Sequence, residues 1–189
     1  MRYIGIIQAR VGSTRLPKKV LKKVEGRTIL EHVISRVKAA KKLDNIIVAT
    51  TIKKEDLEIV KLCAQQGISV FCGSEDDVLD RYYQAARLFK AENIVRITSD
   101  CPLIDPKIID NVIDLYLKEN ADYATNTMPE TFPDGEDVEV FSFNALRIAW
   151  KNAKLASERE HVTPYISCLL YTSDAADEGL GVDLGGRRI

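Results

Sequence analysis

A cationic loop follows the first apolar segment of the chain. Residues 9–19 have the sequence ARVGSTRLPKK and come directly after the apolar run at 3–8. Glycine lets the backbone approach a ligand closely, and the free N–H groups of such a loop can hold phosphate oxygens. Arginine binds two phosphate oxygens at once and lysine acts as a point charge, so the loop suits a polyphosphate. Its cations are Arg10, Arg15, Lys18 and Lys19.

The spacing inside this loop distinguishes it from two other phosphate motifs. It lacks the GxxxxGK[ST] spacing of a Walker A loop and the GxGxxG spacing of dinucleotide-binding folds. The alternative is a basic surface loop that only turns the chain. We predict that residues 9–19 bind phosphate and leave that alternative open.

A carboxylate follows a later apolar segment. Asp100 comes after the run at 93–98 and before a Pro-Leu turn. A carboxylate at the carboxyl end of a strand points to the edge where open α/β sheets bind ligands, and its hard oxygens suit Mg²⁺. A lone Asp more often caps a turn. We predict a metal ligand, because Asp100 would face the cationic loop across one crevice.

For three other polar residues, a functional role competes with a more common structural role. Arg96 could pair with a substrate carboxylate, although an arginine in mid-strand is more often part of a structural ion pair. Cys101 has no nearby base in the sequence, which favours a buried thiol over a nucleophile. His161 could act as a base, since histidine titrates near ~6.5, but a lone histidine in a helix is more often structural.

Apolar strands that alternate with amphipathic helices must position these residues. The pattern predicts βαβ units and a mainly parallel sheet covered by helices on both faces. The loops at 9–19, 73–76 and 98–105 should then converge at one sheet edge. Thr28 and Glu31 form a capping box at the start of the first helix. The predicted strands are 3–8, 45–50, 69–72, 93–98, 121–127 and 137–143, and the predicted helices are 28–37, 54–66, 77–90, 106–118, 144–152 and 157–165.

Several motifs resemble one enzyme family. ARVGSTRLPKKVL at 9–21, GSEDDVLDR at 73–81 and DCPLID at 100–105 are similar to the cytidylyltransferases that make CMP-activated sugars, including acylneuraminate and CMP-KDO synthetases. YYQAA at 82–86 and PDG at 133–135 resemble most the spore coat polysaccharide branch of that family. The resemblance covers roughly residues 3–166 in colinear order.

The resemblance implies a three-layer, Rossmann-like α/β fold of the nucleotide-diphosphosugar-transferase type, which binds CTP and Mg²⁺. It assigns catalysis to Arg10, Lys19 and Asp100, with Asp100 as the metal ligand. Many relatives have lysine where this chain has Thr14, so Lys18 or Lys19 must supply part of that charge. The residues at CTP-binding positions are Ala9, Arg10, Gly12, Ser13, Arg15, Lys19, Ser74 and Arg81. Those on the later elements, where the family binds its sugar, are Asn126, Asp134, Glu139, Glu158, Arg159 and His161.

The reaction implied is transfer of CMP from CTP to a sugar or sugar acid, with release of pyrophosphate, for surface or spore coat polysaccharide. Positioning and electrostatics would dominate such a reaction. A glycosyltransferase of the same fold is one alternative, although Asp100-Cys101-Pro102 lacks the second aspartate of a DxD-like metal motif. A catalytically inactive nucleotide-binding fragment is another. Dimerisation is common among such enzymes, so a homodimer is one outcome for the full-length enzyme.

Composition limits the other classes. The chain has 189 residues, of which 46% are hydrophobic and 29% charged, with 27 Lys plus Arg against 28 Asp plus Glu. This balance argues against nucleic-acid or membrane partners. No apolar run approaches the ~18–20 residues needed to span a bilayer. Four scattered cysteines without a CxxC pair indicate a reducing compartment, so we expect a cytoplasmic protein.

The C-terminal segment differs from the rest. Residues 168–189, CLLYTSDAADEGLGVDLGGRRI, contain four of the ten glycines and show no sustained helix or strand period. They resemble the conceptual translation of sequencing adapters. We expect residues 1–167 to form a cytidylyltransferase domain that is incomplete at its C-terminus, followed by a non-native tail. A native glycine-rich tail is the alternative.

Overall fold

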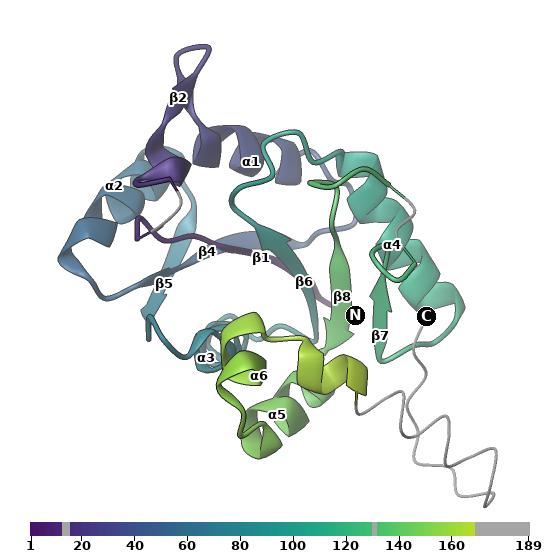
Figure 1. Cartoon of the computed structure of the whole chain (residues 1–189). Coiled ribbons are helices and arrows are strands. Elements are labelled where there is room, and N and C mark those ends of the chain that lie inside the picture. The colour runs from purple at the N-terminus through teal and green to yellow at the C-terminus, as the bar shows by residue number, and fades with distance from the viewer. Residues whose placement is uncertain (13–15, 130–131, 169–189) are drawn as a thin grey trace, which may run out of the picture.

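The computed structural model describes residues 1–12, 16–129 and 132–168 (Figure 1). In this part of the chain, six strands form one sheet in the order β5-β4-β1-β6-β8-β7. Predictions about Ser13, Arg15 and the tail at 169–189 lie outside the described residues. The strands are β1 (Tyr3–Gln8), β4 (Asn45–Thr51), β5 (Ser69–Gly73), β6 (Asn93–Thr98), β7 (Tyr123–Thr125) and β8 (Glu139–Ser142).

The sheet is mainly parallel, as predicted. β5, β4, β1 and β6 run parallel, whereas β8 is antiparallel to both β6 and β7. The chain builds outward from β1 to β4 and β5 on one side and then adds β6 on the other. The order therefore reverses between β1 and β6, which is where open α/β sheets form a ligand crevice. Gln8 and Thr98 are register partners at the carboxyl ends of these two strands.

Helices cover both faces of the sheet, which confirms the three-layer prediction (Figure 1). Apolar side chains from α1, α2 and α4 form one core with Tyr3 and Ile7 of β1. Side chains from α3 and α5 form the second core with Ile4 and Ile6, as expected from alternation along a strand. The helices are α1 (Ile29–Val37), α2 (Leu57–Gln65), α3 (Val78–Leu88), α4 (Pro106–Lys118), α5 (Phe143–Asn152) and α6 (Ala156–His161).

Three local details differ from the sequence prediction. The helix expected from residue 54 begins with a 3-10 turn, η2 (Lys54–Asp56), because Asp56 turns inward to bond with backbone and side-chain donors. Another 3-10 turn, η1 (Lys19–Leu21), and a hairpin of β2 (Lys23–Val24) and β3 (Arg27–Thr28) lie between the cationic loop and α1. The last predicted helix is interrupted at Val162, which has φ of 71°.

The predicted capping box at α1 is present and provides a stability test. Thr28 accepts the backbone N–H of Glu31, and Glu31 accepts the backbone N–H of Thr28 at 2.6 Å. The hydrogen bond from the Thr28 backbone lowers the pKa of Glu31. Glu31→Gln keeps an acceptor for the Thr28 N–H but removes the negative charge at the helix N-terminus, which is expected to cost about 0.3–1 kcal/mol in urea denaturation at pH 7. Because the folded-state pKa is depressed, this difference should vanish as pH falls through that pKa, whereas an unchanged difference at low pH would contradict the assignment.

Candidate active site

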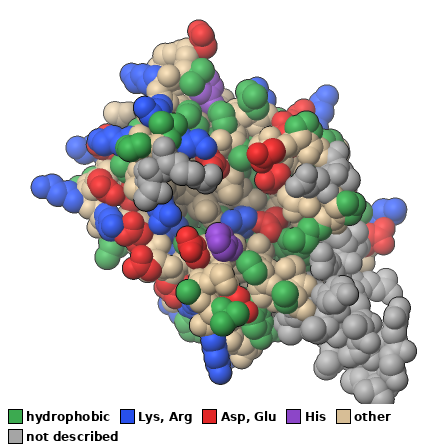
Figure 2. Space-filling model, viewed as in Figure 1, with side chains coloured by type: hydrophobic (Ala, Val, Ile, Leu, Met, Phe, Trp, Pro, Cys, Tyr) green, Lys and Arg blue, Asp and Glu red, His purple; other side chains and the backbone are tan. Residues whose placement is uncertain are grey.

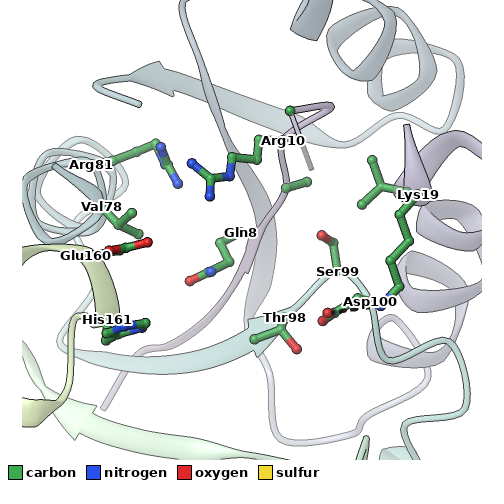
Figure 3. Close-up of a pocket in the computed structure, with 13 residues that line it drawn as sticks. Gln8, Arg10, Lys19, Val78, Arg81, Thr98, Ser99, Asp100, Glu160 and His161 are labelled. Carbon is green, nitrogen blue, oxygen red and sulfur yellow. Dashed lines mark hydrogen bonds and ion pairs between the residues drawn. The ribbon is translucent and has the colours of Figure 1, made fainter. Parts of the chain in front are cut away.

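A pocket of about 420 Å³ lies at the carboxyl ends of β1 and β6, beside α3 and α6 (Figure 3). It therefore occupies the crevice expected where the strand order reverses. In the space-filling view, side chains of both charges surround a hollow, and a histidine lies beside it (Figure 2). The site residues proposed from the sequence that line it are Ala9, Arg10, Gly12, Lys19, Arg81, Asp100 and His161.

The three proposed catalytic residues come from two loops. Arg10 follows β1 and Lys19 begins η1, whereas Asp100 follows β6. The Lys19 ammonium lies 3.3 Å from a carboxylate oxygen of Asp100, and both side chains are partly exposed. The loops after β1 and β6 therefore face one another across one crevice, as the sequence predicted.

Asp100 is held in its charged form. Partial burial opposes ionisation, but the hydrogen bond from Thr98 and the charge of Lys19 outweigh burial and lower the pKa of Asp100. The carboxylate therefore stays negative at neutral pH and is available to a cation. It is also close enough to Lys19 that a bound cation and Lys19 would compete for its oxygens.

Arg81 is a buried cation directed at the pocket. Its residue is only 2% exposed, and its Nε has no hydrogen-bond partner among the described residues. The guanidinium donates to the carbonyl oxygen of Ser74 but forms no ion pair within the described ranges. Burial and the nearby Arg10 charge lower the pKa of Arg81. A buried cation without a carboxylate partner is costly, and an anion in the pocket would compensate for it.

Gly73 allows Arg81 to take this position. A Cβ atom at residue 73 would lie 2.9 Å from a ring carbon of Phe71 and 3.1 Å from Cγ of Arg81. A side chain at residue 73 would therefore require Phe71 or Arg81 to shift. Ser74 does not line the pocket, and its carbonyl oxygen accepts a hydrogen bond from Arg81. Its role in binding CTP stays a prediction.

Five of the six residues proposed for sugar binding lie outside the pocket lining. Asn126 bridges the backbone of Glu136 and Val138, so it shapes a loop. Glu139 pairs with Arg96 and accepts a hydrogen bond from Tyr123. These contacts are internal to the protein, and the sugar-binding roles of Asn126 and Glu139 stay predictions.

The other members of that set belong mainly to α6. Glu158 accepts the backbone N–H groups of Lys154 and Leu155 and so caps the helix. Arg159 binds Asp77, the N-cap residue of α3, and donates to the carbonyl oxygen of Trp150 at 2.8 Å. Asp134 is exposed on a loop. Only His161 borders the pocket, and the Arg159 contacts hold it there by fixing α6 against α3.

The sequence prediction omitted several residues that line the pocket. Gln8 is the last residue of β1, and its side-chain oxygen is buried without a hydrogen-bond partner among the described residues. Glu160 points into the pocket beside His161 (Figure 3). The position of a polar residue at the last step of a buried strand was the available signal for Gln8. The lining residues not predicted are Gln8, Val20, Val78, Thr98, Ser99 and Glu160.

Comparisons with known proteins identify the family. The cytidylyltransferase family model matches residues 4–170. An uncharacterized protein of Methanocaldococcus jannaschii is 54% identical over 166 residues, which cover 88% of this chain and 67% of that protein. The spore coat polysaccharide biosynthesis protein SpsF of Bacillus subtilis is 37% identical over 166 residues, covering 85% and 68% of the two chains.

A solved structure agrees with these matches. A cytidylyltransferase from Leptospira borgpetersenii superposes with a TM-score of 0.86 at 38% identity, covering 91% of this chain and 73% of the other. In the described part of this chain, no helix combines the length and apolar character needed to cross a membrane. The family resemblance of the motifs at 9–21, 73–81 and 100–105 is thereby confirmed. The chain belongs to the cytidylyltransferase family, whose members are CTP-dependent nucleotidyltransferases.

Proposed function

We propose that this protein transfers CMP from CTP to a hydroxyl group of a sugar or sugar acid and releases pyrophosphate. The observation that carries the proposal is Arg81, a buried guanidinium without a carboxylate partner in the described ranges, which faces a pocket that Arg10 and Lys19 also line. A triphosphate would supply the missing negative charge. The polysaccharide role in the name of the Bacillus subtilis relative supports a sugar as the acceptor.

In the proposed reaction, the acceptor oxygen attacks the α-phosphorus and forms a new P–O bond. The bond between the α-phosphorus and the bridging oxygen breaks, pyrophosphate leaves with that electron pair, and the hydroxyl proton passes to water. Arg10 and Lys19 stabilise negative charge on the phosphate oxygens, because preorganised cations require little rearrangement during the reaction. Arg81 holds the nucleotide from the α3 side.

The donor set around Asp100 fits Mg²⁺ that arrives with a nucleotide. Mg²⁺ is usually bound through one or two carboxylates together with substrate phosphates and water. The described residues contain no group of three acidic, histidine or cysteine side chains that could hold a metal alone. Asp100 would be the protein ligand, with the Thr98 and Ser99 hydroxyls nearby in the pocket lining. When bound, the ion would neutralise charge on the triphosphate.

Thermal unfolding with nucleotides tests this function. CTP at 100 times its Kd should stabilise the fold by about 2.7 kcal/mol, equivalent to a rise in Tm of about 5–10 °C for a chain of this size. We expect a smaller rise with UTP and a larger rise with CTP when Mg²⁺ is added. A pyrophosphate assay with a panel of sugars and sugar acids then tests transfer.

Two outcomes of this test would contradict the proposal in different ways. CTP stabilisation without pyrophosphate release for any acceptor would leave a nucleotide-binding protein without transferase activity. A Tm unaffected by CTP would exclude CTP as a ligand of this protein. Arg87→Gln, which changes an exposed arginine on the same helix as Arg81, is the matched control and should keep the full CTP-induced shift.

A further inference from the structure

A buried carboxylate lies behind the part of the cationic loop that the structure describes, residues 9–12. Asp56, the last residue of η2, is 1% exposed. One of its oxygens accepts the backbone N–H of Val11 at 2.7 Å, and the other accepts the Thr51 hydroxyl. Val11 lies between Arg10 and Gly12, both of which line the pocket. Asp56 does not itself line the pocket and contacts the loop through the Val11 peptide.

The loop is fixed on both sides of Arg10. Ala9 donates its backbone N–H to the carbonyl oxygen of Ala49 at 3.1 Å, which extends the sheet by one residue. Val11 donates to Asp56 on the other side. Because both neighbours are anchored, the backbone of Arg10 has little freedom, and its guanidinium extends toward Arg81 across the pocket (Figure 3).

The segment around Asp56 also contacts the second predicted nucleotide segment. Ile52 donates its backbone N–H to the carbonyl oxygen of Gly73 at 3.2 Å. Lys53 forms an ion pair with Glu75. Residues 51–56 therefore connect the loop at 9–12 with the segment that leads into α3 and Arg81, although none of them lines the pocket.

The chemistry of Asp56 explains why it can hold the loop firmly. A buried carboxylate is unfavourable unless its oxygens are hydrogen-bonded. Both oxygens of Asp56 have a donor, and hydrogen bonds to a charged acceptor are shorter and stronger than those between neutral groups. The Val11 N–H would otherwise be a buried donor that no ligand in the pocket could reach, so Asp56 fixes which way this peptide faces.

We propose that Asp56 is a positioning residue that sets the CTP affinity of the pocket by orienting residues 10–12. It touches neither the nucleotide nor the metal and acts through the Val11 peptide. This inference rests on the proposed use of CTP. It adds the segment that follows β4 to the machinery of the site, which the sequence motifs did not suggest.

Calorimetric CTP binding to the full chain, measured well below the Tm of each variant, tests this role. Asp56→Ala should weaken CTP binding at least 10-fold, because Val11 loses its acceptor and Arg10 its fixed backbone. Asp56→Asn retains an oxygen for Val11 but loses the negative charge that strengthens this bond, so CTP binding should weaken about 2- to 3-fold. Thr51→Val leaves the Val11 bond in place and should weaken CTP only 2- to 3-fold.

Asp110→Ala is the matched control. Asp110 also accepts backbone N–H groups, those of Lys41 and Lys42, but it lies away from the pocket. Its loss should lower the Tm without changing CTP affinity. Hydrogen exchange adds a direct readout, since the Val11 amide should exchange at least 10-fold faster in Asp56→Ala while the Ala9 amide stays protected.

The outcomes separate this role from the proposed function. CTP affinity that is unchanged in folded Asp56→Ala, or Val11 exchange that does not accelerate, overturns the positioning role alone. Failure of the unmodified protein to bind CTP overturns both proposals. If Asp56→Ala does not fold, Asp56→Asn and Thr51→Val still decide the question. Asp56 would be assigned to the scaffold if both variants matched the unmodified protein in CTP affinity and in exchange of the Val11 amide, and only their Tm were lowered.

Discussion

Asp100→Asn is expected to reduce pyrophosphate release about 10²- to 10³-fold while CTP still binds in the absence of Mg²⁺. The asparagine has the same shape, so Lys19 and the surrounding backbone keep their places. It lacks the charge that a hard divalent cation needs from a carboxylate ligand, and the other carboxylate lining the pocket among the described residues, Glu160, lies on α6, beside His161. The increase in CTP affinity that Mg²⁺ causes in the unmodified protein should therefore disappear, as measured by calorimetry at matched salt.

Two comparisons make this result specific. Lys19→Ala should weaken CTP binding with and without Mg²⁺, because it removes a cation that we propose to contact phosphate. Asp114→Asn, which removes an exposed carboxylate paired with Lys42, should leave both turnover and the Mg²⁺ effect unchanged. Turnover of Asp100→Asn or Lys19→Ala within a few-fold of the unmodified protein would remove that residue from the mechanism.

The parts of the fold that the sequence predicted well depend on short-range patterns. Alternating apolar runs and helical periods predicted β1, β4, β5 and β6 and the helices between them. The capping box at Thr28 and the Asp105-Pro106 start of α4 are local signals, so the N-termini of α1 and α4 were predicted correctly. The right-handed crossover rule then predicted that the loops at 9–19, 73–76 and 98–105 meet at one sheet edge. Residues from the first and the last of these loops line one pocket, together with Val78 and Arg81, which follow the loop at 73–76.

The candidate sugar-binding residues show the limit of such patterns. A polar side chain on a late loop looks the same in sequence whether it faces a ligand or another part of the protein. Arg159 meets Asp77 from 82 residues away, and Glu139 meets Arg96 from 43 residues away. Pairings at such separations follow from how α6 and β8 are packed, and one sequence contains no signal for them.

The residues missed at the pocket have a related cause. Gln8, Thr98 and Glu160 line one pocket only because the sheet order reverses beside β1 and α6 packs back over α3. The sequence placed Gln8 at the end of a strand and Thr98 two residues before Asp100. The side-chain oxygen of Gln8 has no hydrogen-bond partner among the described residues. Burial and hydrogen-bond satisfaction are tertiary properties, so the sequence contained no signal for the unpartnered Gln8 oxygen or for the burial of Arg81, which the family resemblance had already placed among the CTP-binding positions.

Arg96→Met is expected to have the largest effect on stability, about 3–5 kcal/mol in urea denaturation at pH 7. Arg96 lies in mid-strand on β6 and forms an ion pair with Glu139, and the two side chains are 16% and 11% exposed. Burial opposes the charge of Arg96, but the pairing with Glu139 prevails and raises its pKa. Methionine fills similar volume without the charge, so Glu139 would be left buried without its cationic partner, although the Tyr123 hydroxyl still donates to it.

The double variant Arg96→Met, Glu139→Leu distinguishes a structural pair from a substrate-binding one. Replacing both partners removes the stranded charge, so stability should return to within about 1 kcal/mol of the unmodified protein, since apolar replacements of buried pairs are often neutral. Lys42→Ala, which breaks an exposed pair, should cost at most about 1 kcal/mol. If Glu139 instead binds the sugar, Glu139→Gln would raise the KM for the acceptor while leaving urea stability nearly intact. Loss of stability with an unchanged acceptor KM would place Glu139 in the scaffold, which is the outcome that its contacts with Arg96 and Tyr123 predict.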